Sequence, residues 1–343
     1  MISDKKNQEN IRRVKKILEK QHYALVGNTS AVQICHWTKT SLNGKGVCWK
    51  EKFYGIKSHR CCQMSPAVMW CENQCLHCWR PIENNLGMKL PAIDDPKDII
   101  EDIIKARKKL LIGFKGNTNV PKKKLEEAFN PTLFTLSLSG EATIYPRLAE
   151  LIQEIKNRKA ICFLVTNGLN PEKIKELEEK NSLPTQIAVS MNAPNKKLFK
   201  IWHRSKKKNA WKKFNQTLEL LGKLRGKTRR VVRLTLVRKV KGKKIFSKLS
   251  NMESENLREY AKLIKKVNPN FVHVKGFMSI GYSRKRLPYE KQPWDYEVKK
   301  FAEELVEELK KNGMKGYKIL GEEKRSCVFI IGKNKKNMRI KNL

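Results

Sequence analysis

The sequence predicts an α/β protein whose core is an open, partial (βα)6 barrel of the TIM-like kind, with N- and C-terminal extensions. Two observations support this prediction. Short apolar runs rich in β-branched residues alternate with amphipathic helical stretches over residues 66–277, and such alternation indicates βαβ units and a parallel sheet. Six such units are too few for a closed eight-stranded barrel, which typically needs about 250 residues.

The predicted elements follow one another in a regular order. Residues 1–30 favour a basic helix, whereas residues 31–80 lose helical periodicity and hold seven of the nine cysteines, so their order is expected to depend on bound metal. Proline just inside its start and acidic residues in its first turn predict a helix over 94–111. Further helices are expected at 146–158, 171–180, 212–224, 254–267 and 294–313. Buried strands are expected at 66–70, 132–140, 161–168, 185–193, 229–237 and 271–277.

Three regions are expected from this pattern. Residues 1–62 form an N-terminal extension, residues 63–282 form the barrel core, and residues 283–343 form a basic C-terminal extension with strand-like pieces at 317–320 and 326–331. In such sheets the loops at the carboxyl ends of the strands carry the chemistry.

The charge balance predicts a polyanionic partner. Lysine and arginine total 74 against 33 aspartate and glutamate, a formal net charge of +41. Nucleic acid is the commonest partner of such a chain, with an acidic membrane surface or an acidic protein as alternatives. A thermophilic protein can also be rich in lysine, but its glutamate content then rises as well. Here the acidic residues do not keep pace. The chain has no apolar run of about eighteen residues and no apolar signal core, so we expect a soluble, cytoplasmic monomer.

Three cysteines form the strongest local motif. Cys71, Cys75 and Cys78 occur as CxxxCxxC in WCENQCLHCWRP, directly after the strand expected at 66–70. Three thiolates on one tight loop can bind a four-iron cluster and leave one iron open for substrate. A structural zinc site, with His77 or His59 as fourth ligand, is the alternative.

This motif resembles that of the radical S-adenosylmethionine superfamily. The resemblance implies a 4Fe-4S cluster whose open iron binds the amino and carboxylate groups of S-adenosylmethionine, and a barrel of the radical S-adenosylmethionine type. LSLSGEAT resembles the Gly-Gly-Glu motif of the superfamily, with Ser139 in place of the first glycine. The cofactor-binding residues implied are Gly140, Glu141, Thr166, Asn167, Ser190 and Asn192, all placed at expected strand ends.

A second set of cysteines precedes the first. Cys35, Cys48 and Cys61 are spaced thirteen and thirteen residues apart, which favours a second ligand set over scattered apolar cysteines. Cys62, next to Cys61, is an alternative third ligand.

This spacing, with CWKEKFYGI around Cys48, SLSGEAT, TNG and SMNAP, resembles that of the archaeal 4-demethylwyosine synthases over nearly the whole chain. The resemblance implies a second 4Fe-4S cluster on Cys35, Cys48 and Cys61. It also implies condensation of pyruvate with N1-methylguanosine, 3′ of the anticodon of tRNA-Phe, by a lyase of the wyosine pathway. Lys50 matches a family lysine proposed to form a Schiff base with pyruvate, which requires a lowered pKa. An external one-electron donor is expected.

Aromatic side chains interleaved with basic runs are candidates for stacking on extruded bases. They are Trp49, Trp70, Trp79, Trp202, Trp211 and Tyr282. Two other functions fit parts of the pattern: a different radical S-adenosylmethionine RNA modifier, such as a methylthiotransferase, and a non-catalytic zinc protein that binds RNA.

Overall fold

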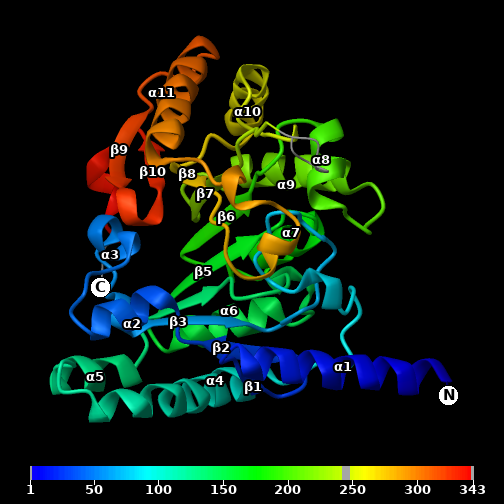
Figure 1. Cartoon of the computed structure of the whole chain (residues 1–343), viewed down its shortest axis with the longest axis vertical. Coiled ribbons are helices and arrows are strands. Elements are labelled where there is room, and N and C mark those ends of the chain that lie inside the picture. Colours follow the sequence, from blue (N-terminus) through cyan, green and yellow to red (C-terminus); the bar gives the residue numbers. More distant parts are fainter. Residues whose placement is uncertain (1, 242–247, 341–343) are drawn as a thin grey trace.

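A computed structural model describes residues 2–241 and 248–340 of the chain; Met1 and residues 341–343 of the two expected extensions lie outside the described residues. Ten strands within those ranges join in one sheet, in the order β1-β2-β3-β4-β5-β6-β7-β8-β10-β9 (Figure 1). The strands are β1 (Ala24–Val26), β2 (Ser30–Gln33), β3 (Cys61–Ser65), β4 (Leu133–Leu136), β5 (Ile161–Thr166), β6 (Gln186–Ser190), β7 (Arg229–Leu236), β8 (Phe271–Gly276), β9 (Lys318–Glu323) and β10 (Val328–Gly332).

The sheet is mixed and does not close. Strands β3 to β8 are parallel and pair in sequence order, as their β-branched, apolar composition predicts. The hairpin β1-β2 adds to β3 in antiparallel orientation, and β10 and β9 add to β8 in the same way. Strands from both expected extensions therefore belong to the same sheet as the central strands.

Helices cover one face of this sheet, which we call the outer face. Within the described ranges the helices are α1 (Ile2–Lys20), α2 (His36–Leu42), α3 (Trp49–Tyr54), α4 (Pro96–Leu111), α5 (Lys122–Phe129), α6 (Leu148–Asn157), α7 (Pro171–Glu179), α8 (Lys196–His203), α9 (Ala210–Lys223), α10 (Ser254–Val267) and α11 (Asp295–Lys311). Side chains that alternate along the strands, such as Cys162 and Leu164 of β5, pack against Ile174 of α7 and its neighbours in the largest apolar cluster.

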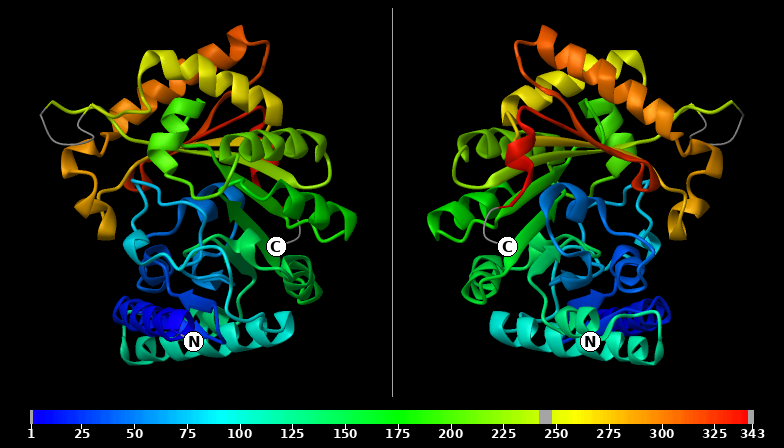
Figure 2. Two further views of the ribbon diagram at one scale, coloured as in Figure 1. Left: turned by 90° about the vertical axis from the view of Figure 1, so that its right-hand side faces the viewer. Right: turned by 90° about the vertical axis from the view of Figure 1, so that its left-hand side faces the viewer.

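The other face of the sheet, the inner face, surrounds the short helix α3. The ring centroid of Tyr54 lies 6.3 Å from that of Phe163 on β5 and 6.1 Å from that of Phe271 on β8. In a flat sheet, strands three positions apart are separated by about 14 Å, which is more than these two distances together. The sheet is therefore curved, and Figure 2 shows α2 and α3 on one side of the strands and α6 and α7 on the other.

Two expected elements differ from the structure. The basic helix ends at Lys20, because His22 has a positive φ and residues 24–33 then form the hairpin β1-β2. The first parallel strand is Cys61–Ser65 rather than 66–70: Pro66 has no N–H for a strand ladder, and Met69 has a φ of 69°. The remaining five expected parallel strands and the six expected helices from residue 94 onward are confirmed, with small shifts of their ends.

Short helices were harder to predict than long ones. Helices α2, α3, α5 and α8 have six to eight residues each, which is too short for a clear apolar period. Among the described residues, no helix is both long and apolar enough to cross a lipid bilayer.

Candidate functional site

The CxxxCxxC loop follows β3 at its carboxyl end and is fixed by helix α8. The backbone N–H of Gln74 donates to the carbonyl of His203 over 2.9 Å, and that of Leu76 donates to the carbonyl of Trp202 over 3.0 Å. Together these two bonds fix the backbone of the loop between Cys71 and Cys78 against the last residues of α8. Since α8 has no clear sequence signal, only the fold reveals this support.

Two arginines hold the carbonyl groups of the loop. Arg204 donates from Nε to the carbonyl of Gln74 over 2.8 Å. Arg286, from the chain after β8, donates to the carbonyls of Leu76 and Cys78 and pairs with Glu83. These two guanidinium groups therefore hold the loop backbone on both sides of Cys75 and at Cys78.

The thiols of the triplet are partly buried. Burial raises the pKa of Cys71, Cys75 and Cys78, so all three carry protons at neutral pH in the absence of metal. Metal binding would displace those protons. Three partly buried thiols on one anchored loop match the ligand set of an iron–sulfur cluster.

The two histidines considered as zinc ligands are engaged elsewhere. His77 accepts from the indole N–H of Trp202 over 2.6 Å and lies 3.2 Å from the amide of Asn192, and burial lowers its pKa to about 3. His59 lies at the other end of β3, 2.8 Å from Glu127. Sequence reasoning instead missed His203, whose Nδ1 is 3.1 Å from the sulfur of Cys75.

Gly140 and Glu141 lie directly against the segment that leads into the triplet. The backbone N–H of Glu141 donates to the carbonyl of Trp70 over 2.7 Å. The buried Glu141 carboxylate accepts from the Thr143 hydroxyl over 2.7 Å and from the backbone N–H of Asn167 over 2.7 Å. Burial, with a smaller contribution from Glu72, raises the pKa of Glu141 to about 7. A cation bound nearby, such as an ammonium group, would favour its charged form.

Replacing Gly140 with alanine is expected to displace the segment that leads into the CxxxCxxC loop. Gly140 has a φ of +71°, and an added Cβ would lie 1.9 Å from the carbonyl oxygen of Ala67. Backbone strain and steric overlap together should lower the free energy of unfolding by at least about 2 kcal/mol, measured by urea denaturation. Gly226→Ala is the matched control, since Gly226 has a φ of +83° but nothing within 4 Å of its added Cβ. Equal losses in the two variants would contradict the steric argument.

The other implied cofactor residues lie at successive strand ends. Thr166 ends β5, and the amide of Asn167 donates to Glu72 over 2.8 Å and lies 3.9 Å from the sulfur of Cys71. Ser190 ends β6, and Asn192 accepts from the backbone N–H of Thr235 over 2.9 Å. The structure therefore gathers these side chains along the same edge of the sheet as the triplet.

The second set of cysteines lies at the inner face, around Lys50. Cys35 precedes α2, Cys48 precedes α3, and Cys61 begins β3. The ammonium group of Lys50 is 4.0 Å from the sulfur of Cys61 and interacts electrostatically with Cys35 and Cys48 as well. Burial raises the pKa of Cys48 to about 11. These three cysteines, far apart in sequence, thus surround one lysine.

Cys61 and Cys62 point to opposite faces of β3. Cys61 belongs to the apolar cluster of the inner face, with Leu133 and Phe163, and its sulfur is 3.6 Å from the hydroxyl of Thr135. Cys62 belongs to the cluster beneath the outer helices and is fully buried there. Only Cys61 shares a face with Lys50, because side chains alternate along a strand.

Lys50 does not carry the lowered pKa that its expected role requires. Burial acts to lower it, but Cys61, Cys48 and Cys35 act more strongly in the other direction, and the net shift of the pKa is upward. Metal bound by those three cysteines would change the charge that they place beside the lysine.

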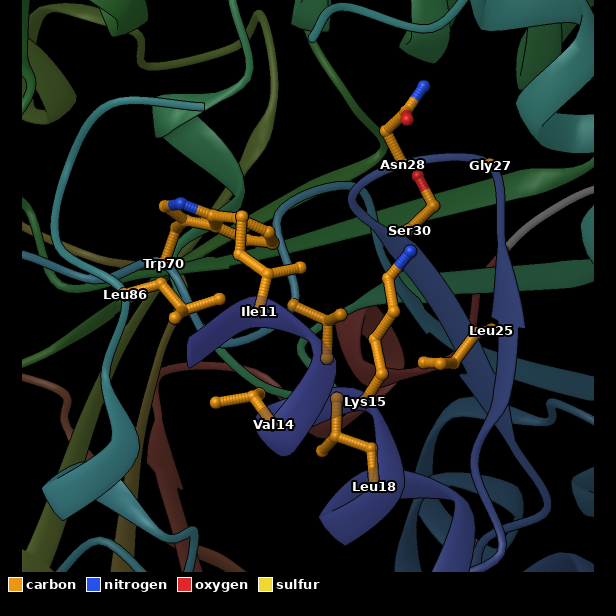
Figure 3. Close-up of a pocket in the computed structure, with 11 residues that line it drawn as sticks. Ile11, Val14, Lys15, Leu18, Leu25, Gly27, Asn28, Ser30, Trp70 and Leu86 are labelled. Carbon is orange, nitrogen blue, oxygen red and sulfur yellow. The ribbon is translucent and has the colours of Figure 1, made fainter. Parts of the chain in front are cut away.

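Helix α1 packs against the residue that precedes the CxxxCxxC loop. Figure 3 shows Ile11 and Val14 of α1 on the side that faces Trp70 and Leu86, around a small, largely apolar pocket. Since Trp70 immediately precedes Cys71, packing of α1 limits how far the loop can move.

The aromatic candidates for base stacking fall into two groups. Trp70 and Trp202 are buried, Trp211 stacks on Phe214, and Trp49 packs against His273. Trp79 is exposed by 40%.

The exposed Trp79 has basic and aromatic neighbours. The guanidinium of Arg80 lies 3.3 Å from the Trp79 ring centroid, and the backbone N–H of Tyr282 donates to the carbonyl of Trp79 over 3.0 Å. Lys285 lies over the Tyr282 ring at 4.9 Å. Next to Cys78, Trp79, Tyr282 and Lys285 form an aromatic and basic surface, whereas Arg80 is buried beside the Trp79 ring.

Comparison with known proteins decides the family. The model of the radical SAM superfamily matches residues 66–246, and that of wyosine base formation matches residues 266–333. The S-adenosyl-L-methionine-dependent tRNA 4-demethylwyosine synthase of Pyrococcus horikoshii is 45% identical over 319 residues, 93% of this chain and 88% of the relative. This chain belongs to the tRNA 4-demethylwyosine synthase family.

Solved structures agree with this assignment. The structure of TYW1 with a lysine-pyruvate adduct bound matches with a TM-score of 0.79 and 29% identity, over 96% of this chain and 97% of that one. The crystal structure of archaeal TYW1 matches with a TM-score of 0.74 and 27% identity, over 96% and 99% of the two chains. The chain thus has the radical S-adenosylmethionine fold of an enzyme of wyosine formation, which implies S-adenosylmethionine and a 4Fe-4S cluster.

Proposed function

We propose that this chain condenses N1-methylguanosine of tRNA-Phe, 3′ of the anticodon, with pyruvate to form 4-demethylwyosine, as a carbon–carbon lyase. The main observation in support is the position of Lys50 on the inner face, 4.0 Å from the sulfur of Cys61. Cys61 begins the five-residue strand β3, and the triplet loop follows the other end of that strand. The proposal places pyruvate near the first end and S-adenosylmethionine near the second.

Two 4Fe-4S clusters fit the residues present. Cys71, Cys75 and Cys78 would hold the first, and Cys35, Cys48 and Cys61 would hold the second. The first cluster, once reduced, supplies a 5′-deoxyadenosyl radical from S-adenosylmethionine, which takes hydrogen from the N1-methyl group of the base.

The cofactor site is built from strand ends. Gly140 allows the backbone to approach closely, and Glu141, Thr166 and Asn167 offer oxygen and nitrogen atoms beside Cys71. We assign Glu141 to the ammonium group of S-adenosylmethionine, and Ser190 and Asn192 to its ribose hydroxyls.

Lys50 is the proposed covalent catalyst. Its amine attacks the keto carbon of pyruvate, the carbonyl oxygen leaves as water after two proton transfers, and a carbon–nitrogen double bond remains. The amine must be unprotonated for this attack. Cys61, Cys48 and Cys35 raise the pKa of Lys50, so the attack depends on the charge that these cysteines and their bound metal place beside the amine.

The RNA is proposed to enter over the surface formed by Trp79, Tyr282 and Lys285, with the buried Arg80 packed against the Trp79 ring. An extruded base can stack on the exposed indole, and Lys285 can contact phosphates. The formal charge of +41 supports such contacts over the wider surface. The chain would act as a cytoplasmic monomer with an external one-electron donor.

Replacing Lys50 with methionine is expected to abolish product formation and the lysine adduct together. Reconstituted protein would be incubated with dithionite, S-adenosylmethionine, pyruvate and methylated tRNA-Phe, and the digested RNA analysed by mass spectrometry. Trapping with cyanoborohydride and peptide mapping would locate the adduct. In the wild type we expect it on Lys50.

The matched control is Lys52→Met. Lys52 lies on the same helix but pairs with Glu323, so its variant should retain both the product and the adduct. An adduct that persists in Lys50→Met would assign the chemistry to another lysine, and absence of 4-demethylwyosine in the wild type would refute the proposed reaction.

A further inference from the structure

Two cations besides Lys50 face the inner side of the sheet at neighbouring positions. Arg233 lies on β7 and Lys275 on β8, and the register pairs Arg233 with His273 and Thr235 with Lys275. Val231 and Phe271, two and four residues earlier on the same strands, belong to the inner-face cluster. Alternation therefore places Arg233 and Lys275 on that face as well.

Arg233 interacts with residues beside both cysteine sets. It interacts electrostatically with Lys50, which is surrounded by the second set, and with His77, which lies within the triplet loop. It also acts on Lys275. The three cations Lys50, Arg233 and Lys275 thus lie within electrostatic reach of one another on the inner face.

This region holds positive charge without a protein carboxylate to balance it. Among the described residues that face inward from β3 to β8, none is aspartate or glutamate. No hydrogen bond or ion pair to the side chain of Arg233 or Lys275 is formed within the described part of the chain. Burial lowers the pKa of both groups, that of Lys275 to about 8.

The other two arginines of β7, unlike Arg233, have hydrogen-bond partners among the described residues. Arg229 donates to the carbonyl of Met338 over 2.8 Å, and its guanidinium lies 4.0 Å from the ring centroid of Tyr54. Arg230 donates to the carbonyl of Val267 over 2.8 Å. Arg233, in the same strand, has no comparable partner in the described structure.

Cations held together in a partly dry site destabilise a protein unless an anion binds between them. A guanidinium group beside an ammonium group fits a carboxylate, because the planar fork can donate two parallel hydrogen bonds. We propose that Arg233 and Lys275 form a carboxylate-binding site that orients a 2-oxo acid with its carbonyl toward Lys50. This inference rests on the proposed function and adds the residues that select the substrate.

The proposed site explains how one small substrate could be selected. A 2-oxo acid has only two polar groups, and binding both would fix its orientation. A neutral analogue, such as methyl pyruvate, keeps the keto group but lacks the charge. Arg233 and Lys275 should therefore discriminate between the two compounds, whereas Lys50 should not.

The test measures binding before chemistry, on reconstituted protein. Binding of radiolabelled pyruvate would be followed by equilibrium dialysis in a Lys50→Met background, where no adduct can form. Adding Arg233→Gln should weaken pyruvate binding about 10- to 100-fold, and Arg233→Lys should restore part of it. Arg258→Gln removes the same charge from the exposed surface of α10 and should change nothing.

A second measurement separates carboxylate binding from general damage. In the chain with Lys50 intact, cyanoborohydride trapping would be followed against the concentration of pyruvate and of methyl pyruvate. Arg233→Gln should raise the half-saturating concentration of pyruvate about 10- to 100-fold and leave that of methyl pyruvate unchanged. Lys275→Met should act in the same direction.

Three results would overturn the inference. They are unchanged pyruvate binding in Arg233→Gln, an equal loss for both compounds, and a loss of pyruvate binding that only follows a loss of iron. The last would mean that the cations balance the charge of the second cluster instead. If the wild type gives no adduct while dialysis still shows binding that depends on Arg233, the Schiff base fails but the carboxylate site stands.

Discussion

Replacing Cys75 with alanine is expected to abolish cleavage of S-adenosylmethionine. Cys75 is the central residue of the triplet, and the backbone on both sides of it is held by α8, so no other cysteine can move into its place. Changes around a metal ligand already cost about 10- to 100-fold, and removal of the ligand itself should cost more. The measurement is the release of 5′-deoxyadenosine under dithionite, together with iron content.

The matched control for this variant is Cys162→Ala. Cys162 is also buried, but it lies on β5 at the outer face, within the apolar cluster beneath the helices. Its variant should lose some stability through a small cavity and keep cleavage. Retained cleavage in Cys75→Ala, at wild-type iron content, would remove the triplet from the mechanism.

The second large effect is expected when the neighbouring cysteines Cys61 and Cys62 are replaced in turn, because only one replacement should stop product formation. Cys61→Ala should halt formation of 4-demethylwyosine while some uncoupled cleavage of S-adenosylmethionine continues. Cys62→Ala should retain product. The physical reason is the direction of the two side chains: Cys61 faces Lys50 and Thr135, whereas Cys62 is buried beneath the outer helices.

This pair would be measured by iron content, 5′-deoxyadenosine release and RNA mass spectrometry on the same preparations. We expect the iron of Cys61→Ala to fall toward that of a single-cluster protein, and that of Cys62→Ala to stay at the wild-type value. Loss of product in Cys62→Ala with normal folding, or normal product in Cys61→Ala, would contradict our choice of ligand.

Sequence reasoning worked best where residues act through local spacing. The CxxxCxxC motif lies within one loop, and long amphipathic helices such as α4 and α10 can be predicted from the regular spacing of their apolar residues. It worked less well for short elements. Helices α2, α3 and α8 have too few residues for a period, yet α3 carries Lys50 and α8 anchors the triplet loop.

The sequence by itself determined the α/β class, the order of the parallel strands and the two groups of cysteines, because these features depend on near neighbours and on regular repeats. Only the tertiary structure decided which residues share a side of the sheet. Alternation along β3 separated Cys61 from Cys62, and curvature of the sheet brought Lys50, Arg233 and Lys275 together from three elements. Such contacts join residues up to about two hundred positions apart, and no local pattern in the chain records them.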